Sequence, residues 1–185
     1  MADRDGEDFP GDASLLVHGF PPIERPGSRV LVLGSMPGIA SLRYRRYYAH
    51  PRNLFWSVAG FWLGFDAGDD YGTRVASVMT AGVALWDVLR SCKRKSSLDT
   101  HIEPASVVPN DLATFLSRHR QIRRICFNGV EAEMLYRRFG FHDLPAARDL
   151  ELLRLPSTSP ANIALDFETK RDAWRFIHPD VKLVE

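Results

Sequence analysis

The chain has 185 residues, of which 45% are hydrophobic and 25% are charged, and its formal net charge at pH 7 is +1. This length and balance indicate one soluble globular domain, and no apolar run approaches the roughly 20 residues of a membrane helix, which excludes an integral membrane protein. Two cysteines, Cys92 and Cys126, are too few for a disulfide scaffold or a four-cysteine iron–sulfur cluster, so we expect a cytoplasmic protein without an export signal.

The charge is distributed unevenly. Residues 1–12 contain five acids and one base, so the remainder of the chain carries +5. The basic residues gather in three clusters: Arg43, Arg45 and Arg46; Arg90, Lys93, Arg94 and Lys95; and Arg118, Arg120, Arg123 and Arg124. Such clusters suit a phosphate backbone, although charge alone favours the alternative that they are ordinary solvated helix ends.

Predicted strands and helices alternate from residue 29 onward. Residues 1–28 predict a frayed start and an irregular lead-in, and residues 29–185 a single domain. In chain order we predict a strand over 29–34, helices over 53–63 and 74–80, a strand over 83–87, a helix over 110–119, a strand over 122–127, a helix over 129–139, a strand over 150–155 and a helix over 166–177. In the last helix we expect Phe167, Trp174 and Ile177 to point inward. This alternation is typical of a parallel sheet with helices on both faces.

The carboxyl ends of the predicted strands carry small or polar residues. Open α/β sheets bind their ligands beyond these ends. The segments there are 34–38, Asp87 onward, Asn128–Gly129 and 155–160. If these loops converge, they form one pocket.

The common nucleotide and metal motifs are missing from these loops. Gly34 and Gly38 lack the spacing and the third glycine of a dinucleotide fingerprint, and no Gly-x-x-x-x-Gly-Lys loop is present. No serine stands between glycines as in a hydrolase elbow, and the six histidines show no zinc spacing.

Five other sequence motifs follow one another along the chain in and around these strand-end loops. They are Gly34-Ser-Met-Pro-Gly38, Tyr47-Tyr-Ala-His-Pro-Arg-Asn-Leu-Phe-Trp56, Gly82-Val-Ala-Leu-Trp-Asp-Val-Leu89, Phe127-Asn-Gly129 and Leu155-Pro-Ser-Thr-Ser-Pro-Ala-Asn162. Together they resemble the uracil-DNA glycosylase superfamily, and within it family 6, the hypoxanthine-DNA (deoxyinosine) glycosylases. The resemblance implies a three-layer α/β/α domain with a central four-stranded parallel sheet. It also implies a monomer that hydrolyses the N-glycosidic bond of a flipped, deaminated base in DNA without metal or cofactor.

The resemblance assigns catalysis to Asn53. Many superfamily members place an Asp or Asn where this chain has Met36, and a thioether neither orients water nor stabilises a cationic sugar. In family 6 the catalytic duty is attributed to the asparagine of the His-Pro-x-Asn segment, which is Asn53. Its amide can orient a water and offer a dipole to the oxocarbenium-like transition state. The alternative role for Asn53 is capping the helix that begins at Leu54, and both roles are compatible.

The same resemblance places Gly34, Ser35 and Met36 against the base and makes Phe55 its stacking partner. Core packing is the alternative role for Phe55. Tyr47 and Tyr48 either line the mouth of the pocket or pack in the ordinary way at the surface. Asp87 stands where uracil-specific relatives have a base-reading Asn. Ionised, it accepts the N1–H of hypoxanthine, while uracil's N3–H would satisfy it equally; a helix cap or an ion pair with Arg90 is the alternative.

Three roles are considered for Asn128: it contacts the base, it supports a pocket loop, or it forms an ordinary Asn-Gly turn. The loop after Leu155 corresponds to the superfamily's second motif, whose usual histidine is replaced here by Leu155. Support for the leaving base then comes from backbone N–H groups or loop hydroxyls, and the loop also contacts DNA. The predicted DNA-binding residues are Ser157, Thr158, Ser159, Pro160 and Asn162.

The four lysines lie outside the matched motifs, so we expect a monofunctional enzyme that leaves an abasic site. Hypoxanthine is the expected base. The alternatives are a uracil or mixed-specificity glycosylase, a catalytically silent protein that binds damaged DNA, and, more weakly, a hydrolase of free nucleosides.

Overall fold

A four-stranded parallel sheet forms the centre of the molecule, whose computed structural model describes residues 14–183. The strands are β2 (Val30–Gly34), β3 (Val83–Asp87), β6 (Arg124–Asn128) and β7 (Glu151–Leu155), in the order β3-β2-β6-β7. All three pairings are parallel, with Gly34 opposite Asp87 and Asn128 opposite Leu155. The predicted four-stranded parallel sheet is therefore confirmed.

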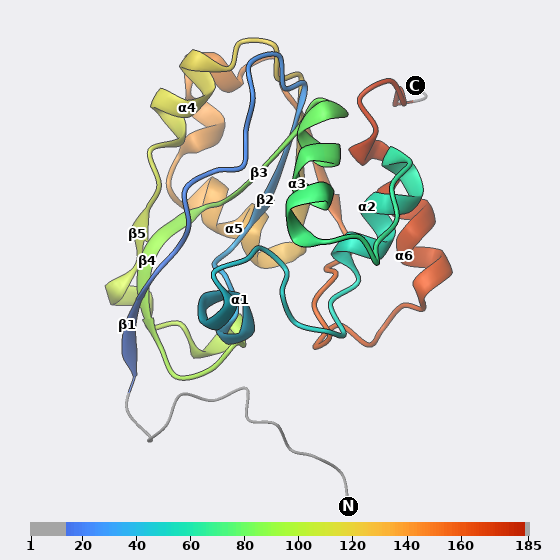
Figure 1. Cartoon of the computed structure of the whole chain (residues 1–185). Helices are drawn as coiled ribbons and strands as arrows, with labels where there is room; N and C mark the ends of the chain where they lie inside the picture. The colour runs from blue at the N-terminus through green and yellow to red at the C-terminus, as the bar shows by residue number, and fades with distance from the viewer. Residues whose placement is uncertain (1–13, 184–185) are drawn as a thin grey trace, which may run out of the picture.

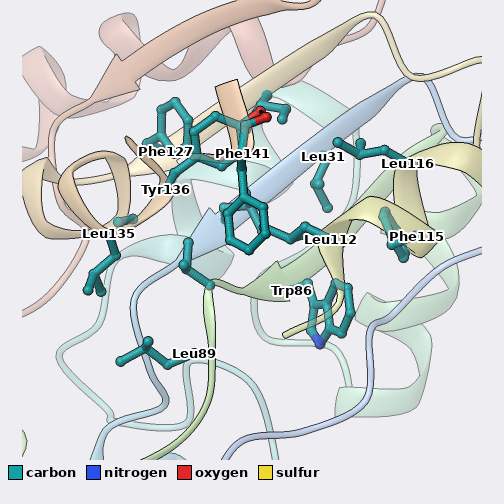
Figure 2. Packing of buried hydrophobic residues seen from close by; sticks show 14 of the residues in the cluster. Leu31, Trp86, Leu89, Leu112, Phe115, Leu116, Phe127, Leu135, Tyr136 and Phe141 are labelled. Atoms are coloured by element: carbon teal, nitrogen blue, oxygen red, sulfur yellow. Dashed lines mark hydrogen bonds between the residues drawn. The ribbon is translucent and has the colours of Figure 1, made fainter. Parts of the chain in front are cut away.

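Helices cover both faces of this sheet (Figure 1). They are α1 (Ile39–Tyr44), α2 (Phe55–Leu63), α3 (Tyr71–Thr80), α4 (Leu112–Arg118), α5 (Val130–Arg138) and α6 (Phe167–Ala173), with 3-10 turns at Asp99–His101, Pro104–Ser106, Phe141–Asp143, Pro145–Ala147 and Trp174–Ile177. Alternate strand residues face opposite sides: Leu31 packs with α4 and α5, as Figure 2 shows, and Val32 packs with α2, α3 and the turn after α6. Buried apolar side chains on both faces fix the three layers.

A second, three-stranded antiparallel sheet was not predicted. It consists of β1 (Leu15–His18), β4 (Leu89–Arg94) and β5 (Val108–Pro109), in the order β1-β4-β5. Strand β4 begins two residues after β3 ends, and Val88 N–H donates to the Gly34 carbonyl at 2.8 Å. The chain that follows β4 is thereby brought back beneath the carboxyl end of the main sheet.

The expectation of an irregular lead-in over residues 1–28 is wrong in part. Leu15–His18 forms a strand because its backbone pairs with β4, and Ile23 bridges Leu85 through two backbone hydrogen bonds of 2.9 Å. The predicted frayed start falls, up to residue 13, outside the described residues. A second correction concerns Phe167, which is 39% exposed, whereas Trp174 and Ile177 point inward as predicted.

Helix boundaries differ from the predicted ones where a polar side chain caps the helix. Helix α3 begins at Tyr71 because the Asp70 carboxylate accepts from Thr73 N–H at 3.2 Å. Helix α4 begins at Leu112 because Asp111 accepts from Thr114 N–H at 3.0 Å.

Candidate active site

The four strand-end loops converge on one pocket. Its walls include Gly34 to Gly38 after β2, Asp87 at the end of β3, Asn128 at the end of β6 and three residues of the loop after β7: Ser157, Ser159 and Pro160. The pocket encloses about 110 Å³. Neighbouring parallel strands place their carboxyl ends together, and this brings residues from distant parts of the chain into one site.

Asp87 forms part of the floor of this pocket. Its side chain is buried, and its Oδ2 has no hydrogen-bond partner among the described residues. Burial, reinforced by the charge of Asp99 and opposed by Arg94, raises the Asp87 pKa to about 7. A Cβ on Gly34 would lie 2.3 Å from Asp87 Oδ1, so a larger residue here would displace this carboxyl group.

Neither structural alternative considered for Asp87 is formed. Asp87 ends a strand, so it caps no helix, and the charged groups that shift its pKa are Asp99 and Arg94 and do not include Arg90. The backbone carbonyl of Asp87 accepts from Asn110 Nδ2 at 2.9 Å. The carboxyl group is therefore held in place through its backbone while its side chain stays available to a ligand.

Asp99 is a second, half-buried acid in the pocket wall that was not predicted. It accepts a hydrogen bond of 2.8 Å from Ser35 Oγ, and burial raises its pKa. Arg94 lies beneath, with Nε donating to the Ser96 carbonyl at 2.5 Å and Nη1 to the Pro37 carbonyl at 3.1 Å. Arg94, counted among the basic clusters, thus supports the pocket loop from inside the protein.

Asn53 lies at the edge of the pocket, immediately before α2. Its Oδ1 accepts from Phe55 N–H at 2.9 Å, and Leu54 N–H donates to the Thr158 carbonyl at 3.0 Å. The amide therefore caps the first turn of α2 and faces the pocket at the same time. A carbonyl oxygen has two lone pairs, so this bond leaves one free for a water molecule.

Tyr47 and Tyr48 line the pocket, and Phe55 does not. Phe55 is fully buried, and Tyr48 stacks on it with ring centroids 3.9 Å apart. Tyr48 has a left-handed backbone, with φ at 53°, a conformation that costs a non-glycine residue about 1–3 kcal/mol. The expected stacking of Phe55 on a base is therefore replaced in this structure by its packing behind Tyr48.

The amide of Asn128 holds the loop after β7. Asn128 Nδ2 donates to Thr158 Oγ1 at 2.9 Å, and Thr158 N–H donates to Asn128 Oδ1 at 2.8 Å. Thr158 is fully buried, which places it out of reach of DNA, contrary to its predicted role. Of the roles considered for Asn128, the structure favours support of the pocket loop.

We expect Thr158→Val to destabilise the protein by about 1–3 kcal/mol, because Asn128 Nδ2 loses its acceptor in the loop. Urea unfolding of the wild type, Thr158→Val and Thr158→Ser would measure this, since serine keeps the hydroxyl group. Equal stability of the valine variant and the wild type would contradict the loop-holding role of this pair.

The remaining loop residues present hydroxyl and amide groups around the pocket. Ser157 Oγ accepts from Ser159 N–H at 3.2 Å, so its own O–H stays available as a donor. Asn162 Nδ2 donates to the Ser157 carbonyl at 3.0 Å, and Lys170 Nζ donates to the Asn162 carbonyl at 2.5 Å. These bonds fix the loop, and Ser157, Ser159 and Pro160 stay on the pocket wall.

Within residues 14–183 no three histidine, cysteine or acidic side chains are grouped as metal ligands. In the same range no helix has the length and apolar character to cross a membrane.

Comparison with known proteins identifies the family. Residues 21–178 match the family model of the uracil DNA glycosylase superfamily. Two hypoxanthine DNA glycosylases are each 32% identical: that of Methanosarcina acetivorans over 80% of this chain and 89% of its own length, and that of Methanosarcina barkeri over 66% and 79%. A solution NMR structure from M. acetivorans, described as a candidate uracil DNA glycosylase, superimposes with a TM-score of 0.71 at 28% identity, covering 89% of this chain and 98% of that one. The chain therefore belongs to the uracil DNA glycosylase superfamily, and the resemblance of its loop motifs to that superfamily is confirmed.

Proposed function

We propose that the protein is a monofunctional DNA glycosylase that releases hypoxanthine from deoxyinosine in DNA. The observation that carries the proposal is a single pocket holding the amide of Asn53 at its edge and the unpartnered carboxyl group of Asp87 at its floor. The relatives named as hypoxanthine DNA glycosylases support the choice of base. A cytoplasmic location and a monomeric state remain predictions.

In the proposed reaction a water molecule attacks C1′ of the flipped deoxyinosine. The C1′–N9 bond breaks, its electron pair leaves with the base, and the base takes up a proton, giving free hypoxanthine and an abasic site. Asn53 orients the water through the free lone pair of Oδ1, and its dipole stabilises the positive charge that develops on the sugar. Met36 contributes an apolar wall that offers the water no strong acceptor.

Asp87 is proposed to read the base. Hypoxanthine presents an N1–H donor beside the O6 acceptor, and a neutral carboxyl group pairs with both, accepting from N1–H and donating to O6. Tyr48 is proposed as the aromatic face against the base, with Phe55 supporting it from behind. Gly34, Ser35 and the hydroxyl groups of Ser157 and Ser159 complete the proposed base and leaving-group contacts.

Among residues 14–183, which include all four lysines, no lysine amine for a Schiff base lines the pocket. This supports hydrolysis over strand cleavage by a lyase step.

A single-turnover excision assay tests the function on labelled duplexes that carry deoxyinosine or deoxyuridine. We expect hypoxanthine to be released well above uracil, leaving an abasic site that is cleaved only after alkali treatment. Faster release of uracil would overturn the proposed specificity. Tight binding to lesion DNA without release of either base would show a silent binder in place of an enzyme.

A further inference from the structure

A groove of about 420 Å³ opens beside the base pocket and shares part of its wall. Tyr47, Tyr48 and Asn53 belong to both. The far side of the groove is built from the chain after α1 and the first turns of α2 and α3, which contribute Arg46 and Arg74. The shared edge offers a path to a DNA strand whose nucleotide enters the pocket.

Two guanidinium groups lie over one aromatic ring in this groove. The Cζ of Arg46 is 5.4 Å and that of Arg74 is 6.0 Å from the ring centroid of Tyr71, and Arg74 also lies 4.8 Å from that of Trp56. Tyr71 is itself fixed, because its hydroxyl group accepts from Tyr47 N–H at 3.0 Å. The aromatic faces hold the flat groups in place while their N–H edges stay available to an anion.

Neither arginine forms an ion pair within residues 14–183. Arg74 Nε is shielded from solvent without an acceptor. The neighbouring acid, Asp70, is bound to the backbone N–H and the hydroxyl group of Thr73. Burial lowers the Arg74 pKa and the charge of Arg46 adds to this effect, whereas Tyr71, Asp70 and Asp69 oppose it. Two guanidinium groups without an ion-pair partner, one of them with a shielded and unsatisfied donor, form a site for an anion.

Two arginines of the other basic clusters are engaged in contacts inside the protein. Arg124 is buried and bound to Glu151 at 2.6 Å and to backbone carbonyl groups, and Arg94 holds the pocket loop from within. Arg118, Arg120 and Arg123 lie around the segment that joins α4 to β6, at the end of the sheet opposite the pocket, in the upper part of Figure 1.

We propose that Arg46 and Arg74 bind a backbone phosphate of the DNA strand next to the flipped nucleotide. This proposal rests on the proposed function, because it assumes that DNA is the substrate. Arginine binds phosphate through two parallel hydrogen bonds, and a phosphate held here would fix the strand relative to the pocket during base extrusion.

Salt-dependent binding tests the site without relying on catalysis. Fluorescence anisotropy with a labelled duplex that carries a tetrahydrofuran abasic analogue measures Kd from low to high KCl for the wild type, Arg46→Gln, Arg74→Gln and the double variant. Each phosphate contact contributes about 0.9 to the slope of log Kd against log salt. We expect the slope to fall by about that amount in the variants, and Kd at low salt to rise several-fold.

Arg120→Gln is the matched control, because it removes one exposed charge at the opposite end of the sheet. Arg46→Lys and Arg74→Lys keep the charge and should keep most of the slope. Arg74 packs on Trp56, so thermal unfolding accompanies its variant; Arg46 is exposed, and its variant is informative even if Arg74→Gln unfolds. An unchanged slope in Arg46→Gln, or an equal fall in Arg120→Gln, would overturn the site. If the wild type binds DNA with these slopes yet excises no base, the proposed function fails while the phosphate site stands.

Discussion

Replacing Asn53 with alanine is expected to lower the single-turnover rate of hypoxanthine excision by about 10²–10³-fold, the cost of removing one positioned polar group from a transition state. The reason lies in the geometry of the amide, whose Oδ1 is anchored by Phe55 N–H in the pocket wall and keeps one lone pair free. Asn128, the other amide of the pocket wall, is bound to Thr158, and Met36 cannot substitute for Asn53.

Helix capping and catalysis by Asn53 make different predictions for two variants. Losing the cap costs about 1 kcal/mol of stability, which lowers Tm without abolishing excision well below Tm. Asn53→Ser keeps an oxygen that can accept from Phe55 N–H, so it should recover stability without recovering the rate. Parallel recovery of stability and rate in the serine variant would show that Asn53 acts only through the helix.

The two central strands β2 and β3 could be predicted from the sequence because they are apolar runs buried on both faces. Each run ends at a small or polar residue, such as Gly34 or Asp87, and parallel pairing then places these ends together. Asp87 and the loop after Leu155 were identified for this reason and from the family resemblance of their motifs, whereas Asn53 was identified from that resemblance alone. The positions of these motifs along the chain were therefore enough to predict most of the site.

Strand β4 was not predicted because four of its six residues are polar or charged. The basic residues between Arg90 and Lys95 gave no sign of a strand, and the pairing partner β1 lies more than 70 residues earlier in the chain. Asp99 depends on that strand, which carries the chain back to the pocket, so no local pattern pointed to it. The one sequence signal for Asp99 was the segment 96–99, in which three of the four residues are polar or charged.

The orientation of individual side chains could not be predicted from the sequence either. Phe55 and Tyr48 lie close in the chain, and either could face a base. The left-handed backbone of Tyr48 and the first turn of α2 decide that Tyr48 covers Phe55. Thr158 turned inward for a similar reason, because its hydroxyl group pairs with Asn128 across the loop.

The second large effect concerns pH. Because burial raises the Asp87 pKa to about 7, the neutral form that pairs with both N1–H and O6 predominates below that pH. We expect kcat/KM for hypoxanthine excision to fall by about tenfold per pH unit above 7, as the ionised carboxylate loses its donor and repels O6. The measurements should stay below the pH at which the base itself ionises.

Two variants assign this profile to Asp87. Asp87→Asn keeps a donor and an acceptor at every pH, so its profile should be flat through neutrality. Asp99→Asn removes the negative charge that helps to raise the Asp87 pKa, so it should move the fall to lower pH. A profile that is unchanged in Asp87→Asn would show that another group titrates.

Stability gives an independent test of the same carboxyl group. An unfolded aspartate has a pKa of about 3.9, so a folded-state pKa near 7 means that the wild type loses stability as pH rises between these values. Asp87→Asn has no such loss, and its Tm advantage over the wild type should grow from pH 5 to about pH 8. If this advantage appears while the excision profile of Asp87→Asn still falls above pH 7, then Asp87 titrates as described but does not read the base.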